Sequence, residues 1–171
     1  TSAVTDMSEL FNGKNTFNDN IGNWNTSNVT NMEKMFYNAF IFNQNIGGWN
    51  TANVTNMSNM FYGISSDFRT TGKFNNNGSA TIGNWNTAKV TDMSGMFQYS
   101  PFNQPIGNWD TSRVTNMSNM FQQDNGFNQN IGGWDVSNVT NMSGMFGFGY
   151  AFQQPLANWN TANVTDMSGM F

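Results

Sequence analysis

Hydrophobic residues recur along the chain with a period near 25 residues. The repeated block is Val-Thr, then two Met three residues apart, then Phe, as in VTNMEKMF from Val29 to Phe36. Successive Val-Thr pairs lie 25, 25, 36, 24, 25 and 25 residues apart, at Val4, Val29, Val54, Val90, Val114, Val139 and Val164. A period held over six steps is typical of arrays in which each repeat packs only on its neighbours.

Each repeat has two halves with different patterns. The first half, FNQNIGGW in residues 42–49, is crowded with Asn and Gly and predicts a short strand centred near the Ile-Gly positions, followed by a turn. In the second half Met32, Met35 and Phe36 share a helical face, which predicts about two helical turns. Thr30 and Glu33 have the spacing of a capping box at the start of that helix.

These patterns predict the fold class, a repeat solenoid with a short parallel β-sheet on one side and short helical, 3-10 or irregular turns on the other. We expect a single array over residues 1–171 with about six to seven coils, because one coil cannot bury its Ile, Trp, Val, Met and Phe alone. The 36-residue step contains an insertion at about residues 62–82. Both ends fall midway through a coil, so we expect the array to be a segment of a longer chain.

Composition excludes several kinds of chemistry. Six Lys and Arg against ten Asp and Glu leave a net charge of −4 that is spread thinly, which argues against binding to nucleic acid. No apolar stretch approaches the roughly 20 residues of a membrane span, so we expect no membrane insertion. The absence of His and Cys removes catalytic triads and most transition-metal sites, and we predict no cofactor and no metal site. Composition does not exclude calcium binding, since the ligands of calcium include Asn and Asp oxygens. However, no Asp-x-Asp-x-Asp loop occurs in the sequence.

Comparison of the repeats shows which carboxylates are candidates for catalysis. A residue type that is replaced by another at equivalent positions of other repeats is a poor candidate for a unique catalytic role. Asp92 stands where Asn31 and Asn56 stand in other repeats, and Asp110 stands where Asn25 does. Such exchange fits turn or capping hydrogen bonds, and it fits poorly with acid–base work, which needs an ionisable group. The spacing of the remaining Asp and Glu residues suggests no pair of carboxylates facing each other across a cleft, which glycoside hydrolysis requires. We therefore predict a protein without enzymatic activity.

The six Trp residues allow two interpretations. Sugars stack on exposed aromatic rings, whereas a core also requires one aromatic residue per repeat at a constant phase. We predict that the Trp column is buried, together with the Val, Met and Phe columns. The Trp column consists of Trp24, Trp49, Trp85, Trp109, Trp134 and Trp159.

Asn-x-Ser/Thr sequences are frequent, because the repeat itself generates them. The position of Asn28 holds Lys89 and Arg113 in other repeats, and since long cations are seldom buried, this position is predicted to face water. A glycan there is sterically possible in a secreted eukaryotic protein. The candidate N-glycosylation sites are Asn28, Asn53, Asn77, Asn138 and Asn163.

The pattern W-x-T-S-x-V-T-x-M-S-x-M-F, preceded by FNQNIGGW, resembles the bacterial surface-protein repeat of about 25 residues known as the DUF285 or BspA-like repeat. This repeat is a distant relative of leucine-rich repeats, and the resemblance covers essentially the whole chain except the insertion. It implies a leucine-rich-repeat-like solenoid in surface or secreted proteins, some of them linked to adhesion. Phe, Ile and Trp stand here where many members have Leu, and the chain is rich in Asn.

Together these expectations describe an extracellular or cell-surface repeat protein with a structural or adhesive role, as part of a fibre or stalk whose copies or repeats associate end to end. The alternative is a ligand-binding module that recognises a host or surface protein or a glycan through the sheet face or the insertion at 62–82. Asp67, Arg69 and Lys73 are the candidate partner contacts, because only the insertion breaks the polar pattern of the repeat.

Overall fold

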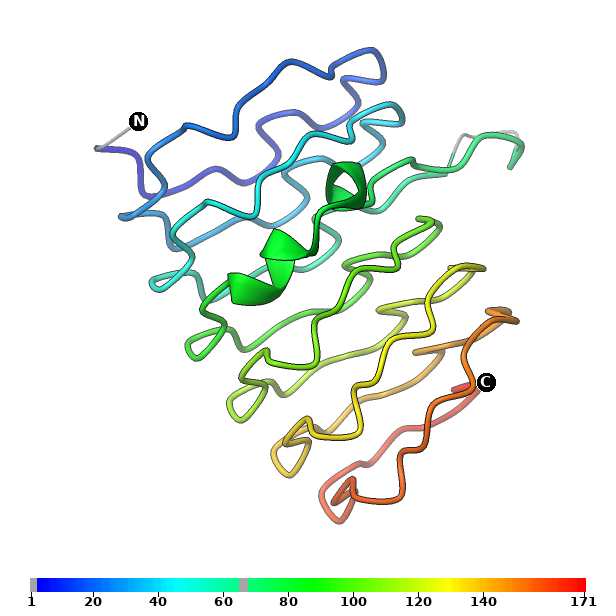
Figure 1. The fold of residues 1–171 in the computed structure, drawn as a ribbon. Coiled ribbons are helices and arrows are strands. Elements are labelled where there is room, and N and C mark those ends of the chain that lie inside the picture. The colour runs from blue at the N-terminus through cyan, green and yellow to red at the C-terminus, as the bar shows by residue number, and fades with distance from the viewer. Residues whose placement is uncertain (1–2, 65–67) are drawn as a thin grey trace.

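The computed structural model describes residues 3–64 and 68–171, which form successive coils stacked along one direction (Figure 1). One parallel β-bridge joins each pair of neighbouring coils, at the Asp or Asn that follows the Val-Thr pair. The bridges pair Asp6 with Asn31, Asn31 with Asn56, Asn56 with Asp92, Asp92 with Asn116, Asn116 with Asn141, and Asn141 with Asp166. These steps equal the spacing of the Val-Thr pairs, so the register predicted from the sequence is confirmed.

The predicted leucine-rich-repeat-like solenoid with a short parallel β-sheet is wrong. Within residues 3–64 and 68–171 the bridges stay isolated, no strand or sheet forms, and the only helices are two 3-10 segments in the insertion. The strand was expected at the Ile-Gly positions, but this half of each coil is irregular and contains a turn. The bridges fall in the other half, where helical turns were expected.

The second half of each coil is a chain of overlapping turns. The amide of Met35 donates to the carbonyl of Met32 in the same coil at 3.2 Å. The amide between them, that of Lys34, donates to the carbonyl of Ser58 in the next coil at 2.9 Å. Because this alternation continues along the coil, backbone donors are satisfied without a strand or a helix.

Positive φ angles explain why no helix forms here. Lys34 has a φ of 52°, and the equivalent positions are also in the left-handed region at Asn59, Gly95, Asn119 and Gly144. Gly and Asn tolerate this region, whereas a right-handed helix requires negative φ throughout. The Asn or Gly between the two Met of most repeats was therefore the sequence signal for turns.

The predicted capping box is also wrong. The Glu33 amide donates to Oδ1 of Asn31 at 3.0 Å. The Thr30 hydroxyl instead donates to the carbonyl of Thr5 in the preceding coil at 3.1 Å. The equivalent hydroxyl of Thr55 donates to the Thr30 carbonyl at 3.1 Å, so this Thr column links successive coils.

Equivalent side chains stack into continuous hydrophobic columns. Val29 is fully buried, and Phe36 stacks on Phe61 of the next coil with ring centroids 5.5 Å apart. Phe42 from the first half of the coil stacks on Phe36 at 3.9 Å, which joins the two halves. Burying a side chain of this size contributes about 1.5–3 kcal/mol. The predicted burial of the Val, Met and Phe columns is confirmed for the interior coils, whereas exposed members occur at Val4, Met167 and Phe171.

The insertion leaves the stack as an arm and returns across its front face (Figure 1). Ile64 and Thr71 form an antiparallel bridge within the arm. Two 3-10 helices follow, η1 (Asn76–Gly78) and η2 (Ala80–Asn84), and lie over the first halves of the neighbouring coils.

Buried polar contacts hold the two 3-10 helices against the stack. Asn76 is fully buried, and its Oδ1 accepts from the Ile46 amide at 2.9 Å while its Nδ2 donates to the Ser79 carbonyl at 2.7 Å. The preceding coil, which contains Ile46, carries glycine at the point of closest approach. A Cβ at Gly47 would lie 2.1 Å from Oγ1 of Thr81, so only glycine lets η2 pack so closely.

Replacing Gly95 by alanine is expected to lower the free energy of unfolding by about 1–2 kcal/mol, because an L residue is strained in the left-handed region. The φ of Gly95 is 60°, and a Cβ there would also meet Oδ1 of Asn59 at 2.3 Å. The matched control is Gly133→Ala, where a Cβ meets nothing within 4 Å and φ is not left-handed. This control is expected to change stability by less than about 0.5 kcal/mol in urea unfolding. Equal losses in the two variants would contradict the turn geometry.

Candidate functional site

Side-chain oxygens of Asp and Asn close a turn at two positions of the repeat. At the bridged position the amide of Ser94 donates to Oδ1 of Asp92 at 2.8 Å. At the position after Trp, the amide of Ser112 donates to Oδ1 of Asp110 at 3.0 Å. The same bond is made by Asp6, Asn25, Asn31, Asn50, Asn56, Asn86, Asn116, Asp135, Asn141, Asn160 and Asp166. The prediction that Asp and Asn exchange because both serve turns is therefore confirmed.

The same hydrogen bonds lower the pKa of the carboxyls that make them. The Ser112 hydroxyl, which donates to Oδ1 of Asp110 at 2.6 Å, lowers the pKa of Asp110 most, and the Ser112 amide adds to this effect. Asp6 has a lowered pKa because the Ser8 amide donates to it. The pKa values of Asp135 and Asp166 are lowered in the same way. Carboxylates held ionised in this way are poorly suited to act as general acids near neutral pH.

The Trp column is buried in the interior coils. Trp49, Trp85, Trp109 and Trp134 are each 3% exposed, while Trp24 and Trp159 are partly buried. From Trp49 onward, the indole N–H of each Trp donates to the carbonyl of an Ile in the preceding coil. The distance from Trp109 to Ile82 is 3.1 Å. The predicted core role is confirmed, so the interior Trp rings offer no face for stacking sugars.

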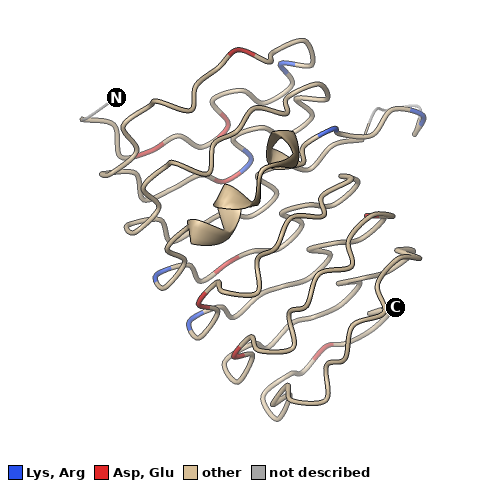
Figure 2. Cartoon of the chain, viewed as in Figure 1, with Lys and Arg blue, Asp and Glu red and all other residues tan. Residues whose placement is uncertain are grey.

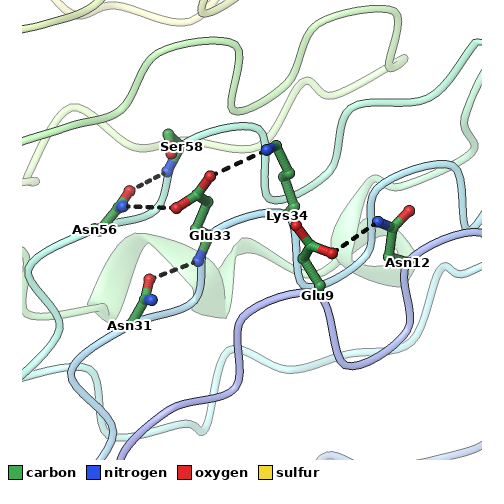
Figure 3. Close-up of polar contacts among 7 residues, drawn as sticks. All are labelled: Glu9, Asn12, Asn31, Glu33, Lys34, Asn56 and Ser58. Atoms are coloured by element: carbon green, nitrogen blue, oxygen red, sulfur yellow. Dashed lines mark hydrogen bonds and ion pairs between the residues drawn. The ribbon is translucent and has the colours of Figure 1, made fainter.

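A small charged cluster lies on the second halves of three successive coils, at Glu9, at Glu33 and Lys34, and at Asn56 (Figure 3). Glu33 contacts Lys34 at 3.2 Å and accepts from Nδ2 of Asn56 at 3.4 Å, and Glu9 accepts from Asn12 at 3.3 Å. The hydrogen bond and charge of Glu33 raise the pKa of Lys34. Both members of the ion pair are 36% exposed, and surface pairs of this kind contribute little. The cluster is therefore a solvated patch, and charge elsewhere on the chain is scattered (Figure 2).

Among the carboxylates outside the repeated positions that the structure describes, Asp124 is the one that the fold buries. It is 2% exposed, and its Oδ1 accepts from the amides of Gly126 and Phe127 at 2.9 and 3.1 Å. Its Oδ2 has no hydrogen-bond partner among the described residues. Burial raises the pKa of Asp124 well above its usual range, and the backbone amides only partly oppose this. The equivalent position holds Lys14, Ala39 and Ser100 in other coils, so a carboxylate here is specific to one coil.

The candidate glycosylation residues lie at the surface. The Nδ2 atoms of Asn53, Asn138 and Asn163 donate to a Ser carbonyl of the preceding coil, at 2.9, 2.7 and 2.7 Å. Exposed positions are Asn28, Asn77, Asn138, Asn163, Lys89 and Arg113, while Asn53 is half-buried. The prediction that this position faces water is confirmed, with Asn53 the least accessible.

The predicted partner contacts do not come together in a cavity. Arg69 and Lys73 are exposed, and Asp67 lies outside the described residues. Lys73 lines only a small cavity with Tyr62 and Gly72, and a larger groove is lined by residues that follow in η1 and η2. The sequence pattern does not single out η1 and η2 as a site, because their polar residues resemble those of the ordinary repeat.

A groove of about 550 Å³ lies where η1 and η2 cross the stack. Asn77, Thr81 and Asn84 line one side of it. The other lining residues come from the first halves of two neighbouring coils and are Asn20, Gly22, Asn23, Gln44, Asn45, Gly47 and Gly48. Its volume falls in the range of small-molecule sites, and none of its lining residues is charged or aromatic.

Several amide groups of the groove are not used within the protein. Asn45 accepts at Oδ1 from the Gly47 amide and from the Thr81 hydroxyl, both at 3.0 Å. Among the described residues, no hydrogen bond is made by the side chains of Asn23 or Asn84, and both side chains are exposed. Each amide offers a carbonyl acceptor and two N–H donors. The groove can therefore bind neutral polar groups, but it holds no residue suited to acid–base or nucleophilic chemistry.

Two further properties concern metals and membranes. Within residues 3–64 and 68–171, no three His, Cys, Asp or Glu side chains are grouped so that they could hold a metal ion. In the same part of the chain, no helix combines the length and the apolar character that crossing a membrane requires.

Comparison with known proteins identifies a family. The family model described as "Mycoplasma protein of unknown function, DUF285" matches residues 1–76 and 65–171, which together span the whole chain. No curated protein and no solved structure gives a significant match.

Proposed function

Since the chain belongs to the DUF285 family, we propose that it is a non-catalytic repeat protein of the cell surface or extracellular space, acting in structure or adhesion. The observation that carries this proposal is the self-complementarity of the coils. Thr55 donates back to the Thr30 carbonyl of the preceding coil at 2.8 Å, while Met32 donates forward to the carbonyl of Asn56 at 3.0 Å. Each coil therefore offers backbone donors and acceptors on one face that match those on its opposite face. Coils of another copy can stack on it by the same hydrogen bonds.

Exposed apolar side chains support association through the coil faces. The Met column is buried wherever a coil covers it on both sides, but Met167 is 45% exposed. Phe171 stacks on Phe146 with one ring face, and it is 75% exposed. A further coil, whether it belongs to the same chain or to a second copy, would bury both side chains in the register that joins neighbouring coils within the chain.

The non-catalytic part of the proposal rests on how the acids are used. The Asp residues of the repeated positions accept backbone N–H bonds, and the chain has no His or Cys. Asp124 is buried without a second carboxylate among the groups that shift its pKa. The placement at the cell surface rests on the resemblance of the repeat to that of bacterial surface proteins.

Sedimentation of the full chain over a wide concentration range tests the association. We expect reversible formation of dimers and longer species, and we expect Met167→Lys to weaken this association by about tenfold or more, since it places a charge on an apolar coil face. Tyr150→Lys is the matched control, because Tyr150 is 82% exposed and lies outside the repeated columns. A chain that stays monomeric at all concentrations, or that associates equally in both variants, would overturn the proposed coil-to-coil association.

A second candidate function is a ligand-binding module that recognises a protein or a glycan. The groove beside η1 and η2 is the observation that favours it, because the insertion alone interrupts the regular surface of the stack. The sheet face considered as an alternative site does not exist, since the described residues form no sheet.

A further inference from the structure

We infer that the groove beside η1 and η2 is a binding site for a short neutral oligosaccharide. The inference rests on the second candidate function and is independent of association between coils. It starts from the chemistry of the lining, where five Asn, one Gln, one Thr and three Gly provide hydrogen-bonding groups without charge.

The lining argues against charged and apolar ligands. An anion would need Lys, Arg or a suitable helix N-terminus, and a cation would need carboxylates, but the groove has neither kind of side chain. A lipid or an apolar peptide side chain would need hydrophobic walls, which are also missing from the lining. Neutral groups that both donate and accept hydrogen bonds remain, and sugar hydroxyls are such groups.

The unused amides are placed along the direction of stacking. Asn23 and Asn84 occupy the same position of the repeat, immediately before Trp, and one coil lies between them. Coils at the usual spacing of paired backbones separate such residues by about 10 Å, which a short oligosaccharide can span. Each free amide can donate to one hydroxyl and accept from its neighbour on the same ring.

The coil between the two amides leaves the floor of the groove open. Its residue at this position is Gly48, where a Cβ would meet nothing within 4 Å. An Asn at this position would fill the space between Asn23 and Asn84, so the glycine keeps the floor open. Gly133 occupies the same position in a coil away from the groove and is equally unobstructed.

Aromatic stacking is absent from the lining, so binding depends on hydrogen bonds alone. A few hydrogen bonds of ordinary net strength correspond to a dissociation constant in the millimolar range. Weak binding of this kind is sufficient where several copies of the protein bind one glycan-bearing surface together, because multivalent binding raises the overall affinity.

NMR titration of the ¹⁵N-labelled full chain tests the inference. The probes are four neutral tetrasaccharides, built from glucose, galactose, mannose and N-acetylglucosamine, together with a sulfated tetrasaccharide and a neutral Ser-Asn peptide. We expect at least one neutral tetrasaccharide to shift the side-chain amide signals of Asn23 and Asn84, while the sulfated sugar and the peptide leave them unchanged.

Matched variants locate the binding. Gly48→Gln is expected to weaken it by about tenfold or more, because the longer side chain fills the groove, whereas Gly133→Gln is expected to have no effect. Asn23→Ala and Asn84→Ala should each weaken binding, with Asn108→Ala, at the same position outside the groove, as the control. Thermal unfolding of each variant checks that the fold is retained.

Three results would overturn the inference. The first is the absence of any shift with all four neutral sugars, and the second is binding that survives Gly48→Gln. The third is a preference for the sulfated sugar or the peptide, which would keep a ligand site in the groove but reject its assignment to neutral saccharides. Sedimentation of the same variants reports separately on coil-to-coil association.

Discussion

Trp109→Ala is expected to lower the free energy of unfolding by about 3–5 kcal/mol, the usual cost of deleting a buried Trp. The indole is 3% exposed and stacks on Trp85 of the preceding coil with ring centroids 6.1 Å apart. Its N–H donates to the carbonyl of Ile82, which would lose this partner in a buried site. Urea unfolding followed by circular dichroism measures the loss.

Two controls separate packing from a general sensitivity to mutation. Asn108→Ala changes the exposed neighbour of Trp109 and is expected to cost less than about 0.5 kcal/mol. Trp159→Ala should cost clearly less than Trp109→Ala, because Trp159 is only partly buried. A loss below about 1 kcal/mol for Trp109→Ala would contradict the assignment of the Trp column to the core.

Asp124→Asn is expected to raise the free energy of unfolding at neutral pH by about 1–3 kcal/mol, because a neutral amide takes the place of a buried carboxylate whose Oδ2 is unpaired among the described residues. The asparagine oxygen can still accept from the amides of Gly126 and Phe127. The substitution removes the charge that burial disfavours, and burial is the main reason why the pKa of Asp124 is raised.

The pH dependence has a defined sign. A carboxyl whose pKa is raised by folding binds its proton more tightly in the folded state, so the native protein loses stability as pH rises from the ordinary carboxyl pKa to the raised one. Asp124→Asn should remove this decline, and the two proteins should converge at acid pH, where Asp124 is protonated in both states. Urea unfolding at a series of pH values measures both curves.

Asp135→Asn is the matched control, because folding shifts the pKa of Asp135 in the opposite direction to that of Asp124. The Ser137 hydroxyl and amide lower the pKa of Asp135, so its contribution is lost as pH falls through the lowered pKa. The free energy of unfolding of this variant should therefore fall slightly less in acid than that of the parent, with little change near neutral pH.

An Asp124→Asn protein that is no more stable at neutral pH would show that the buried carboxylate is accommodated without cost.

The repeat register and the columns of the core were predictable from the sequence. The spacing of the Val-Thr pairs equals the spacing of the inter-coil bridges, including the 36-residue step across the insertion. The exchange of Asp with Asn at equivalent positions predicted their role in turns, because both side chains accept the same backbone N–H bond. Periodicity carries this information because equivalent positions have equivalent neighbours.

The local backbone was predicted wrongly. The spacing of Met32, Met35 and Phe36 fits one face of a helix, but left-handed residues at Lys34 and its equivalents convert the segment into linked turns. A three-residue spacing places side chains together in either structure, so the hydrophobic pattern alone could not distinguish them. The Asn and Gly at this position carried the distinguishing signal, through their tolerance of positive φ.

The groove and the buried Asp124 belong to the tertiary structure. The sequence by itself determined which residues stack on which, because that depends only on a constant interval along the chain. It did not determine that η1 and η2 fold back over the stack at Gly47, or that Oδ2 of Asp124 is enclosed with no partner in the described part of the chain. Both features depend on how an irregular segment packs against several coils at once, and such contacts leave no period in the sequence.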